Sequence, residues 1–173
     1  MVGLQDSILQ KRALKEAISQ MPVHLFQPGS SLHTVAASSS NVLVVGNGPV
    51  SSYVVSKAKR LHDDGCIVVR FNDFQTSAGA QSIHPDILVV SAETTKRTID
   101  AWKDECLIIA MAPCKKFNDE LVATLPNCTA VKPEFWTIMT RASNFHRGFV
   151  LLFALLQAWK NHKFHVLGFG GAG

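Results

Sequence analysis

The chain is poor in charge. Only 17% of its 173 residues are Asp, Glu, Lys or Arg, while 47% are hydrophobic. This composition excludes intrinsic disorder as the general state, and a chain of this length can bury a sizeable core in one domain without disulfide bonds. Basic residues outnumber acidic ones by 17 to 13, which gives a net charge of +4. Because the basic residues form no stripe with interleaved aromatic side chains, the sequence argues against a nucleic-acid partner.

The chain also lacks paired cysteines and long apolar runs. Its four cysteines, Cys66, Cys106, Cys114 and Cys128, include no C-x-x-C pair, which argues against a zinc site and against a disulfide framework. Three of them lie in or beside apolar runs, as buried thiols in a reducing compartment do. The longest apolar run, residues 149–156, is too short to span a bilayer. Since the charged N-terminus does not resemble a signal peptide, we expect a soluble, cytoplasmic protein without a transmembrane segment.

Residues 1–40 are expected to form an N-terminal helix and loop, followed by a main domain over residues 41–173. Five apolar side chains share one arc of a helix, namely Leu4, Ile8, Leu14, Ile18 and Met21. Pro22 ends that helix, because proline cannot continue one. Residues 24–40 are rich in serine and predict a connecting loop.

Short apolar runs without alternation predict strands that are buried on both faces of a sheet. These runs lie at residues 42–45, 66–69, 87–90, 107–110 and 164–167. Helices are predicted between them, over residues 50–62 with Pro49 at the first position, 95–102 and 147–160. Strands that alternate with helices predict an α/β fold: a Rossmann-like, open, mostly parallel sheet with helices on both faces.

Ligands of such sheets bind beyond the carboxyl ends of the strands. Three predicted loops lie there, at residues 46–49, 70–73 and 91–94. Gly46 and Gly48 stand between a strand and a helix, where backbone N–H groups and a helix N-terminus favour an anion. The alternative is a tight turn without a ligand. The dinucleotide fingerprint fails, because the third glycine and the acidic residue about 20 positions farther on are missing.

Two asparagines strengthen the case for a ligand. Asn47 lies within the first of these turns, and Asn72 lies at the end of the next strand. Because a carboxamide offers both donors and an acceptor, such a pair suits a neutral, patterned ligand such as a base and its ribose. For Arg70 two interpretations stay open, a phosphate partner or a strand-end charge that reaches solvent.

The sequence VLVVGNGP at residues 42–49, followed by VVRFN at residues 68–72, resembles the large sialyl motif of the sialyltransferases. In that family a strand runs into Gly-Asn-x-Gly, and a second strand ends in Arg-x-Asn. The sequences GFVLL at residues 148–152 and HVLGFG at residues 165–170 resemble the family's small motif. The resemblance covers residues 41–170.

The resemblance implies a donor site for CMP-sialic acid, with Asn47 and Asn72 at the ribose and phosphate and Gly148 where the helix approaches the nucleotide. The donor-binding residues that it implies are Gly46, Asn47, Gly48, Arg70, Asn72, Arg147 and Gly148. It also implies transfer of sialic acid, with inversion, to a hydroxyl of a glycan acceptor. The family uses a histidine as base and requires no metal or other cofactor.

The chain departs from the family in three ways. Arg147 stands where the family has Ser or Thr, and no cysteine lies before Cys66 or after Cys128 to form the disulfide of the animal members. No residue matches the family's catalytic histidine, which lies downstream of the small motif. The chain is therefore either a fragment or a short relative without the usual base. His146, at the predicted helix start, is the one histidine placed to act as phosphate donor or base, against a capping or surface role.

Two alternative functions remain at this stage. One is a nucleotide-binding relative without catalytic activity, and the other is an NAD(P)-dependent oxidoreductase. We also expect self-association through the C-terminal edge, because the helix at residues 147–160 is apolar around most of its circumference and the last strand is left at a sheet edge.

Overall fold

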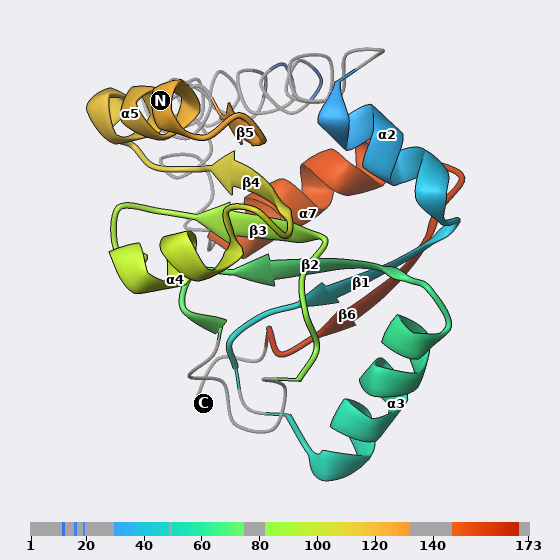
Figure 1. Cartoon of the computed structure of the whole chain (residues 1–173). Helices are drawn as coiled ribbons and strands as arrows, with labels where there is room; N and C mark the ends of the chain where they lie inside the picture. Colours follow the sequence, from blue (N-terminus) through green and yellow to red (C-terminus); the bar gives the residue numbers. More distant parts are fainter. Residues whose placement is uncertain are drawn as a thin grey trace, which may run out of the picture.

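The computed structural model describes residues 12, 16, 19, 30–48, 50–74, 82–131 and 147–169 of the chain. Its centre is a six-stranded sheet with the order β5-β4-β3-β2-β1-β6, in which neighbouring strands are parallel (Figure 1). The strands are β1 (Asn41–Val45), β2 (Ile67–Phe71), β3 (Ile87–Val90), β4 (Leu107–Ala110), β5 (Cys128–Ala130) and β6 (Lys163–Leu167).

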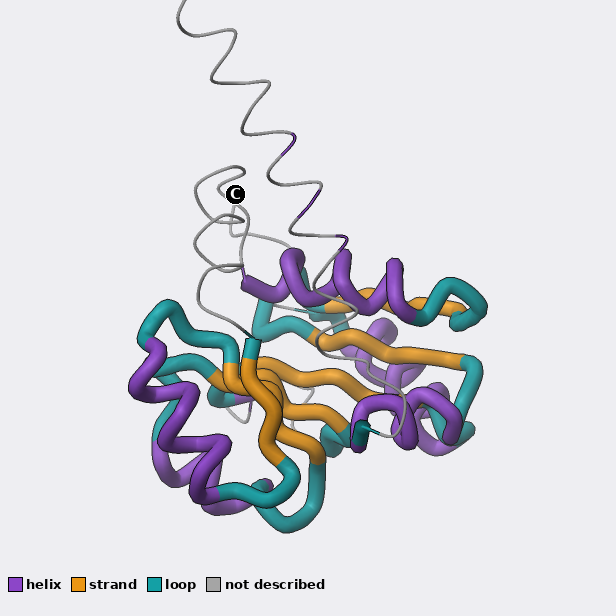
Figure 2. Tube along the Cα trace, turned by 90° about the horizontal axis from the view of Figure 1, so that it is seen from above, coloured by secondary structure: helices purple, strands orange, loops and turns teal. Residues whose placement is uncertain are grey.

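Helices cover both faces of this sheet (Figure 2). One face packs against α2 (Ser31–Ser38) and α7 (Arg147–Ala158). The other face packs against α3 (Ser52–Asp63), α4 (Lys96–Trp102) and α5 (Lys115–Thr124). The predicted fold class, a Rossmann-like α/β fold with an open parallel sheet, is therefore confirmed. Within the described residues, no helix combines the length and the hydropathy that crossing a membrane requires.

Alternate residues of a strand serve the two faces. Val42 and Val44 of β1 join the apolar cluster beneath α2 and α7, whereas Leu43 and Val45 join the cluster beneath α3. All four side chains are buried. A strand that is covered on both faces has no exposed position for a polar residue, which explains the continuous apolar sequence. The five predicted strands are confirmed, with shifts of one or two residues at some ends.

Other predictions of local structure were wrong. The serine-rich stretch at residues 24–40 contains helix α2, which Ser30 caps by accepting a hydrogen bond from the His33 N–H. Helix α5 and the short strand β5 were not predicted. Helix α3 begins at Ser52 with Ser51 as its cap, so Pro49 is not its first residue. These elements lack the continuous apolar runs that marked the predicted strands.

Of the predicted N-terminal helix, the structure describes Arg12, Glu16 and Ser19, which are helical and exposed. The five apolar positions of that helix lie outside the described residues.

The strand order reverses direction once. The chain builds β1 to β5 outward in one direction, and then α7 returns it to place β6 on the other side of β1. Open parallel sheets bind ligands at the carboxyl ends of the strands on either side of such a reversal. Here those ends are Val45 of β1 and Leu167 of β6, which pair in the sheet. These two strand ends lie within the first part of the segment that resembles the large sialyl motif and the last part of the segment that resembles the small one.

Candidate functional site

The loops after β1 and β6 are in direct backbone contact. The N–H of Gly46 donates to the carbonyl oxygen of Leu167, and the N–H of Gly48 donates to that of Gly168, both at 2.8 Å. A Cβ atom on Gly46 would lie 2.4 Å from the carbonyl oxygen of Gly168. Gly168 itself has a φ of +69°, which side chains disfavour. Glycine at these two positions is therefore explained by the close approach of two strands' ends.

This contact changes the interpretation of the first turn. Because the N–H groups of Gly46 and Gly48 already have carbonyl acceptors, they are not the anion donors that the strand–turn–helix pattern suggested. A contact between these residues and a nucleotide through other atoms stays a prediction. The glycines allow the ends of β1 and β6 to approach each other closely. The polar side chains of Asn47 and Asn72 are the other candidates at this edge of the sheet.

Asn47 links the end of β1 to the end of β2. Its Nδ2 donates to the carbonyl oxygen of Phe71 at 2.9 Å. Phe71 directly precedes Asn72, so this bond brings the two candidate asparagines to one edge of the sheet. The residue itself is exposed, as a side chain that meets a ligand must be.

Asn72 is held in an unusual conformation. Its φ is +47°, the left-handed region in which asparagine is more frequent than most residues. Its N–H donates to the carbonyl oxygen of Val89, and its Oδ1 accepts from the hydroxyls of Ser91 at 3.0 Å and Thr94 at 2.9 Å. Its Nδ2 makes no hydrogen bond within the described part of the chain. Asn72 therefore has two N–H donors available at the sheet edge.

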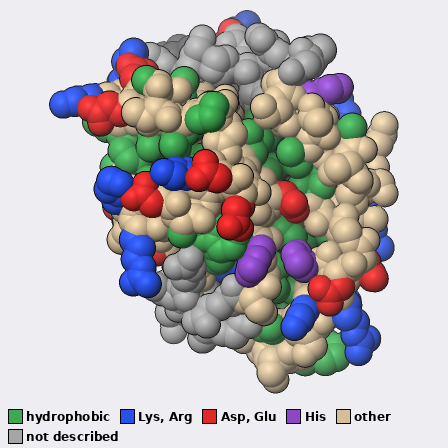
Figure 3. Space-filling model, viewed as in Figure 1, with side chains coloured by type: hydrophobic (Ala, Val, Ile, Leu, Met, Phe, Trp, Pro, Cys, Tyr) green, Lys and Arg blue, Asp and Glu red, His purple; other side chains and the backbone are tan. Residues whose placement is uncertain are grey.

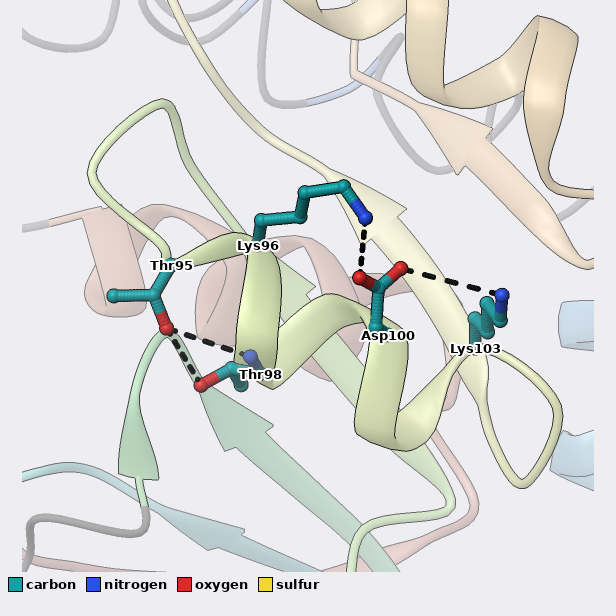
Figure 4. A network of polar contacts seen from close by, with 5 residues as sticks. All are labelled: Thr95, Lys96, Thr98, Asp100 and Lys103. Atoms are coloured by element: carbon teal, nitrogen blue, oxygen red, sulfur yellow. Dashed lines mark hydrogen bonds and ion pairs between the residues drawn. The ribbon is translucent and has the colours of Figure 1, made fainter.

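Asp73 serves the fold rather than a ligand. Its carboxylate accepts from the N–H and the hydroxyl of Thr95 and from the hydroxyl of Thr98, at the start of α4. Burial raises the pKa of this carboxyl, but the hydrogen bonds from Thr98 and Thr95 outweigh it and hold the pKa below its ordinary value. Figure 4 shows these two threonines facing each other at the start of the helix. The acidic residue nearest the position that a dinucleotide's ribose needs is thus already engaged.

The remaining charges on α4 are solvated. Asp100 pairs with Lys96 and, at 4.0 Å, with Lys103 (Figure 4). Exposed pairs of this kind contribute little to stability. On the face shown in Figure 3, Lys and Arg side chains alternate with Asp and Glu and form no continuous basic patch.

Arg70 is completely buried, with 0% of its surface exposed. The guanidinium lies 4.5 Å from the ring of Phe74, and donates from Nη1 to the carbonyl oxygen of Ile83 at 3.4 Å and from Nη2 to that of Phe74 at 3.3 Å. Burial lowers its pKa to about 10. The interpretation as a strand-end charge that reaches solvent is wrong. A role as phosphate partner stays a prediction, and in this conformation no part of the side chain is exposed to a ligand.

Two phenylalanine rings from the ends of β2 and β6 pack together at the end of β1, a contact that the sequence did not reveal. Phe169, after β6, packs edge-on against Phe71 at the end of β2, with 5.7 Å between the ring centres. Phe169 also lies against Gly46, since a Cβ there would come within 3.3 Å of its ring. The signal available in the sequence was the glycine on each side of Phe169, but its partner was not predictable.

The other candidate residues belong to the start of α7. Arg147 and Gly148 open this helix. Because α7 leads directly into β6, its first turn lies toward the carboxyl ends of the strands, the same side as Asn47 and Asn72 (Figure 1). The side chain of Arg147 and all of His146 lie outside the described residues, so their predicted roles stay predictions.

No protein-family model matches the chain, and no curated protein matches it in sequence. The resemblance to the sialyltransferases therefore depends on the motif residues and their placement.

Proposed function

We propose that the carboxyl ends of β1 and β2, together with the start of α7, bind CMP-sialic acid, and that the chain transfers sialic acid to a glycan hydroxyl. The observation that carries the proposal is the pair Asn47 and Asn72. They follow adjacent parallel strands, the side chain of one bonds the residue before the other, and Asn72 has an NH₂ group without a described partner.

Several contacts favour a nucleoside monophosphate over a dinucleotide. A dinucleotide site needs backbone N–H groups at the first turn for the pyrophosphate and an acidic residue for the ribose. Here the N–H groups of Gly46 and Gly48 donate to the carbonyl oxygens of Leu167 and Gly168, and Asp73 bonds to Thr95 and Thr98. Helix α3 begins only at Ser52, beyond the turn, with the hydroxyl of Ser51 accepting from the N–H of Val54.

The start of α7 supplies a place for the single phosphate of CMP. Helix N-termini attract anions through their oriented N–H groups, and α7 has 12 residues with its first turn toward the strand ends. The NH₂ group of Asn72 then remains for the uncharged part of the nucleotide, and the exposed Asn47 lies at the same sheet edge. One anion site beside one site for uncharged groups supports a ligand that has a single phosphate between a nucleoside and a sugar.

The transfer is a single displacement with inversion. The acceptor's hydroxyl oxygen bonds to the anomeric carbon of sialic acid, the bond from that carbon to the phosphate oxygen breaks, and CMP leaves. A base takes the hydroxyl proton, which contributes about 10²–10⁴ in rate. His146 is the proposed base within this chain.

Calorimetry with CMP as the probe tests donor binding. We expect wild-type protein to bind CMP, and Asn72→Ala and Asn47→Ala to bind it about 5- to 150-fold more weakly, since losing a hydrogen bond to a buried polar group costs about 1–3 kcal/mol. Asn161→Ala is the matched control, because it removes an exposed carboxamide at the opposite end of α7. Wild-type protein that binds NAD but not CMP would contradict the proposal.

A transfer assay tests catalysis separately. CMP-sialic acid is incubated with a mixture of galactosides, and release of CMP is measured together with the sialylated product. If the His146→Ala variant transfers sialic acid more slowly but binds CMP as tightly as the wild type, the result supports His146 as the base. CMP binding without any transfer would instead indicate a nucleotide-binding protein without this activity.

A further inference from the structure

The loop between β3 and α4 holds the side chain of Asn72 from one side. Ser91 and Thr94 are buried, with 1% and 7% of their surfaces exposed. Their hydroxyls both bond to Oδ1 of Asn72. The sequence marked this loop as a third place where a ligand could bind, but in the structure its hydroxyls point at a neighbouring loop.

Backbone groups fix the direction of these bonds. The Thr94 hydroxyl accepts from the N–H of Ser91 at 2.9 Å, and the Ser91 hydroxyl accepts from the N–H of Glu93 at 3.4 Å. Since each hydroxyl has one proton, that proton is left for Asn72. Both hydroxyls therefore donate to Asn72, and the atom that receives them must be the oxygen of its carboxamide. Hydrogen bonds in such a chain strengthen one another.

This arrangement determines what Asn72 can offer to a ligand. Its Oδ1 accepts two hydrogen bonds, which fills both of its lone-pair positions. The carboxamide is planar, so its NH₂ group points away from Ser91 and Thr94. A freely rotating asparagine presents either an acceptor or donors, whereas this one presents donors alone.

We propose that Ser91 and Thr94 are positioning residues, which lock the carboxamide of Asn72 so that it recognises only a hydrogen-bond acceptor on the uncharged part of the ligand, such as a carbonyl oxygen of the base. The role of Asn72 in binding rests on the proposed function; its locked orientation rests on the contacts alone. Neither Ser91 nor Thr94 touches the ligand in this scheme. Each acts through Asn72.

A double-mutant cycle with CMP tests the coupling. Thr94→Val keeps the shape of the side chain and removes the hydroxyl, and Thr94→Ser keeps the hydroxyl. We expect Thr94→Val to weaken CMP binding about five- to tenfold, Thr94→Ser to bind as wild type does, and Thr94→Val to have no further effect in an Asn72→Ala background. An equal loss in both backgrounds would overturn the proposal, because Thr94 would then act through the structure at large. Ser91→Ala is the second variant if Thr94→Val fails to fold.

Nuclear magnetic resonance of the Asn72 side chain tests the locked orientation without any ligand. We expect the ¹⁵N relaxation of its NH₂ group to show a rigid side chain in the wild type and a mobile one in Thr94→Val, with the exposed Asn161 as the mobile reference. If wild-type protein ignores CMP but this change is seen, the proposed function fails and the positioning role stands. If CMP binds but the NH₂ group of Asn72 is as mobile as that of Asn161, the positioning role is wrong.

Discussion

Replacing Gly46 by alanine tests whether the backbone at the end of β1 packs directly against the backbone at the end of β6. The added Cβ would lie 2.4 Å from the carbonyl oxygen of Gly168 and 3.0 Å from its carbonyl carbon. These are backbone atoms of a strand end, bonded to Gly48, and they cannot rotate away as a side chain does. The φ of Gly46 is not positive, so alanine is not penalised by its own backbone conformation. The whole cost comes from the clash.

The magnitude follows from overpacking. Inserting one methyl group into a closely packed site costs about 1–3 kcal/mol, and more where nothing can yield. Since the obstacle is backbone, we expect Gly46→Ala to reduce the free energy of unfolding by about 3 kcal/mol. For a domain of this size that is a decrease of roughly 6–12 °C in the melting temperature. The separation of β1 from β6 should also weaken CMP binding.

Gly65 provides the matched control. It has a φ of +79°, but a Cβ there meets no atom within 4 Å. Gly65→Ala therefore measures the conformational penalty alone, which is about 1–2 kcal/mol. Gly168→Ala combines both effects, because it has a positive φ and its Cβ would lie 2.8 Å from the carbonyl oxygen of Gly46. Urea unfolding should rank the losses as Gly168→Ala, then Gly46→Ala, then Gly65→Ala. A Gly46→Ala variant no less stable than Gly65→Ala would refute the close contact.

Three further predictions concern other parts of the fold. Asn118→Ala should lose about 2–4 kcal/mol in urea unfolding, because this side chain is 2% exposed and bonds the backbone of Ala112 and Val131; an unchanged midpoint would contradict this. Burial raises the pKa of the Cys106 thiol to about 12 from 9.0. Above pH 9 the unfolded chain therefore loses this proton before the folded one does, and the free energy of unfolding falls by up to about 1.4 kcal/mol per pH unit until pH 12. Cys106→Ala should flatten that slope, and an identical slope would contradict the assignment. Light scattering should show association that grows with concentration, since Leu156 and Val166 are each 41% exposed and β6 pairs only with β1 among the described strands; a constant monomer mass would count against it.

The sequence predicted the strands well because burial on both faces leaves a simple pattern. The runs at residues 87–90 and 107–110 coincide with β3 and β4. Helix α2 was missed because its apolar contacts, centred on Leu32, occupy only part of a short serine-rich segment. Local composition favoured a loop there, and packing against the sheet outweighed it.

The positions of the candidate residues in the fold were predictable, but their contacts were less so. The asparagines lie where the strand pattern placed them, because parallel strands end at one edge. The burial of Arg70 was not predictable, since it depends on Phe74 and Ile83, which reach it from the loop between β2 and β3. Nor could the sequence show that the hydroxyls of Ser91 and Thr94 bond to Asn72, because the bonded residues lie 19 and 22 positions apart in the chain and form no local motif.

The glycines and the asparagines of the two motif-like segments carry different information. Gly46 and Gly168 lie against each other, so the packing of β1 on β6 accounts for both of them without any ligand. Their joint presence therefore argues for the fold. Asn47 and Asn72 are different, because one is exposed and the other leaves its NH₂ group without a described partner. Both side chains also serve the fold, because Asn47 bonds the carbonyl oxygen of Phe71 and Asn72 accepts from Ser91 and Thr94. Those bonds do not use the NH₂ group of Asn72, and packing alone does not account for that group at a sheet edge. The case for a nucleotide thus depends on the two carboxamides, and their substitution, rather than that of the glycines, decides it.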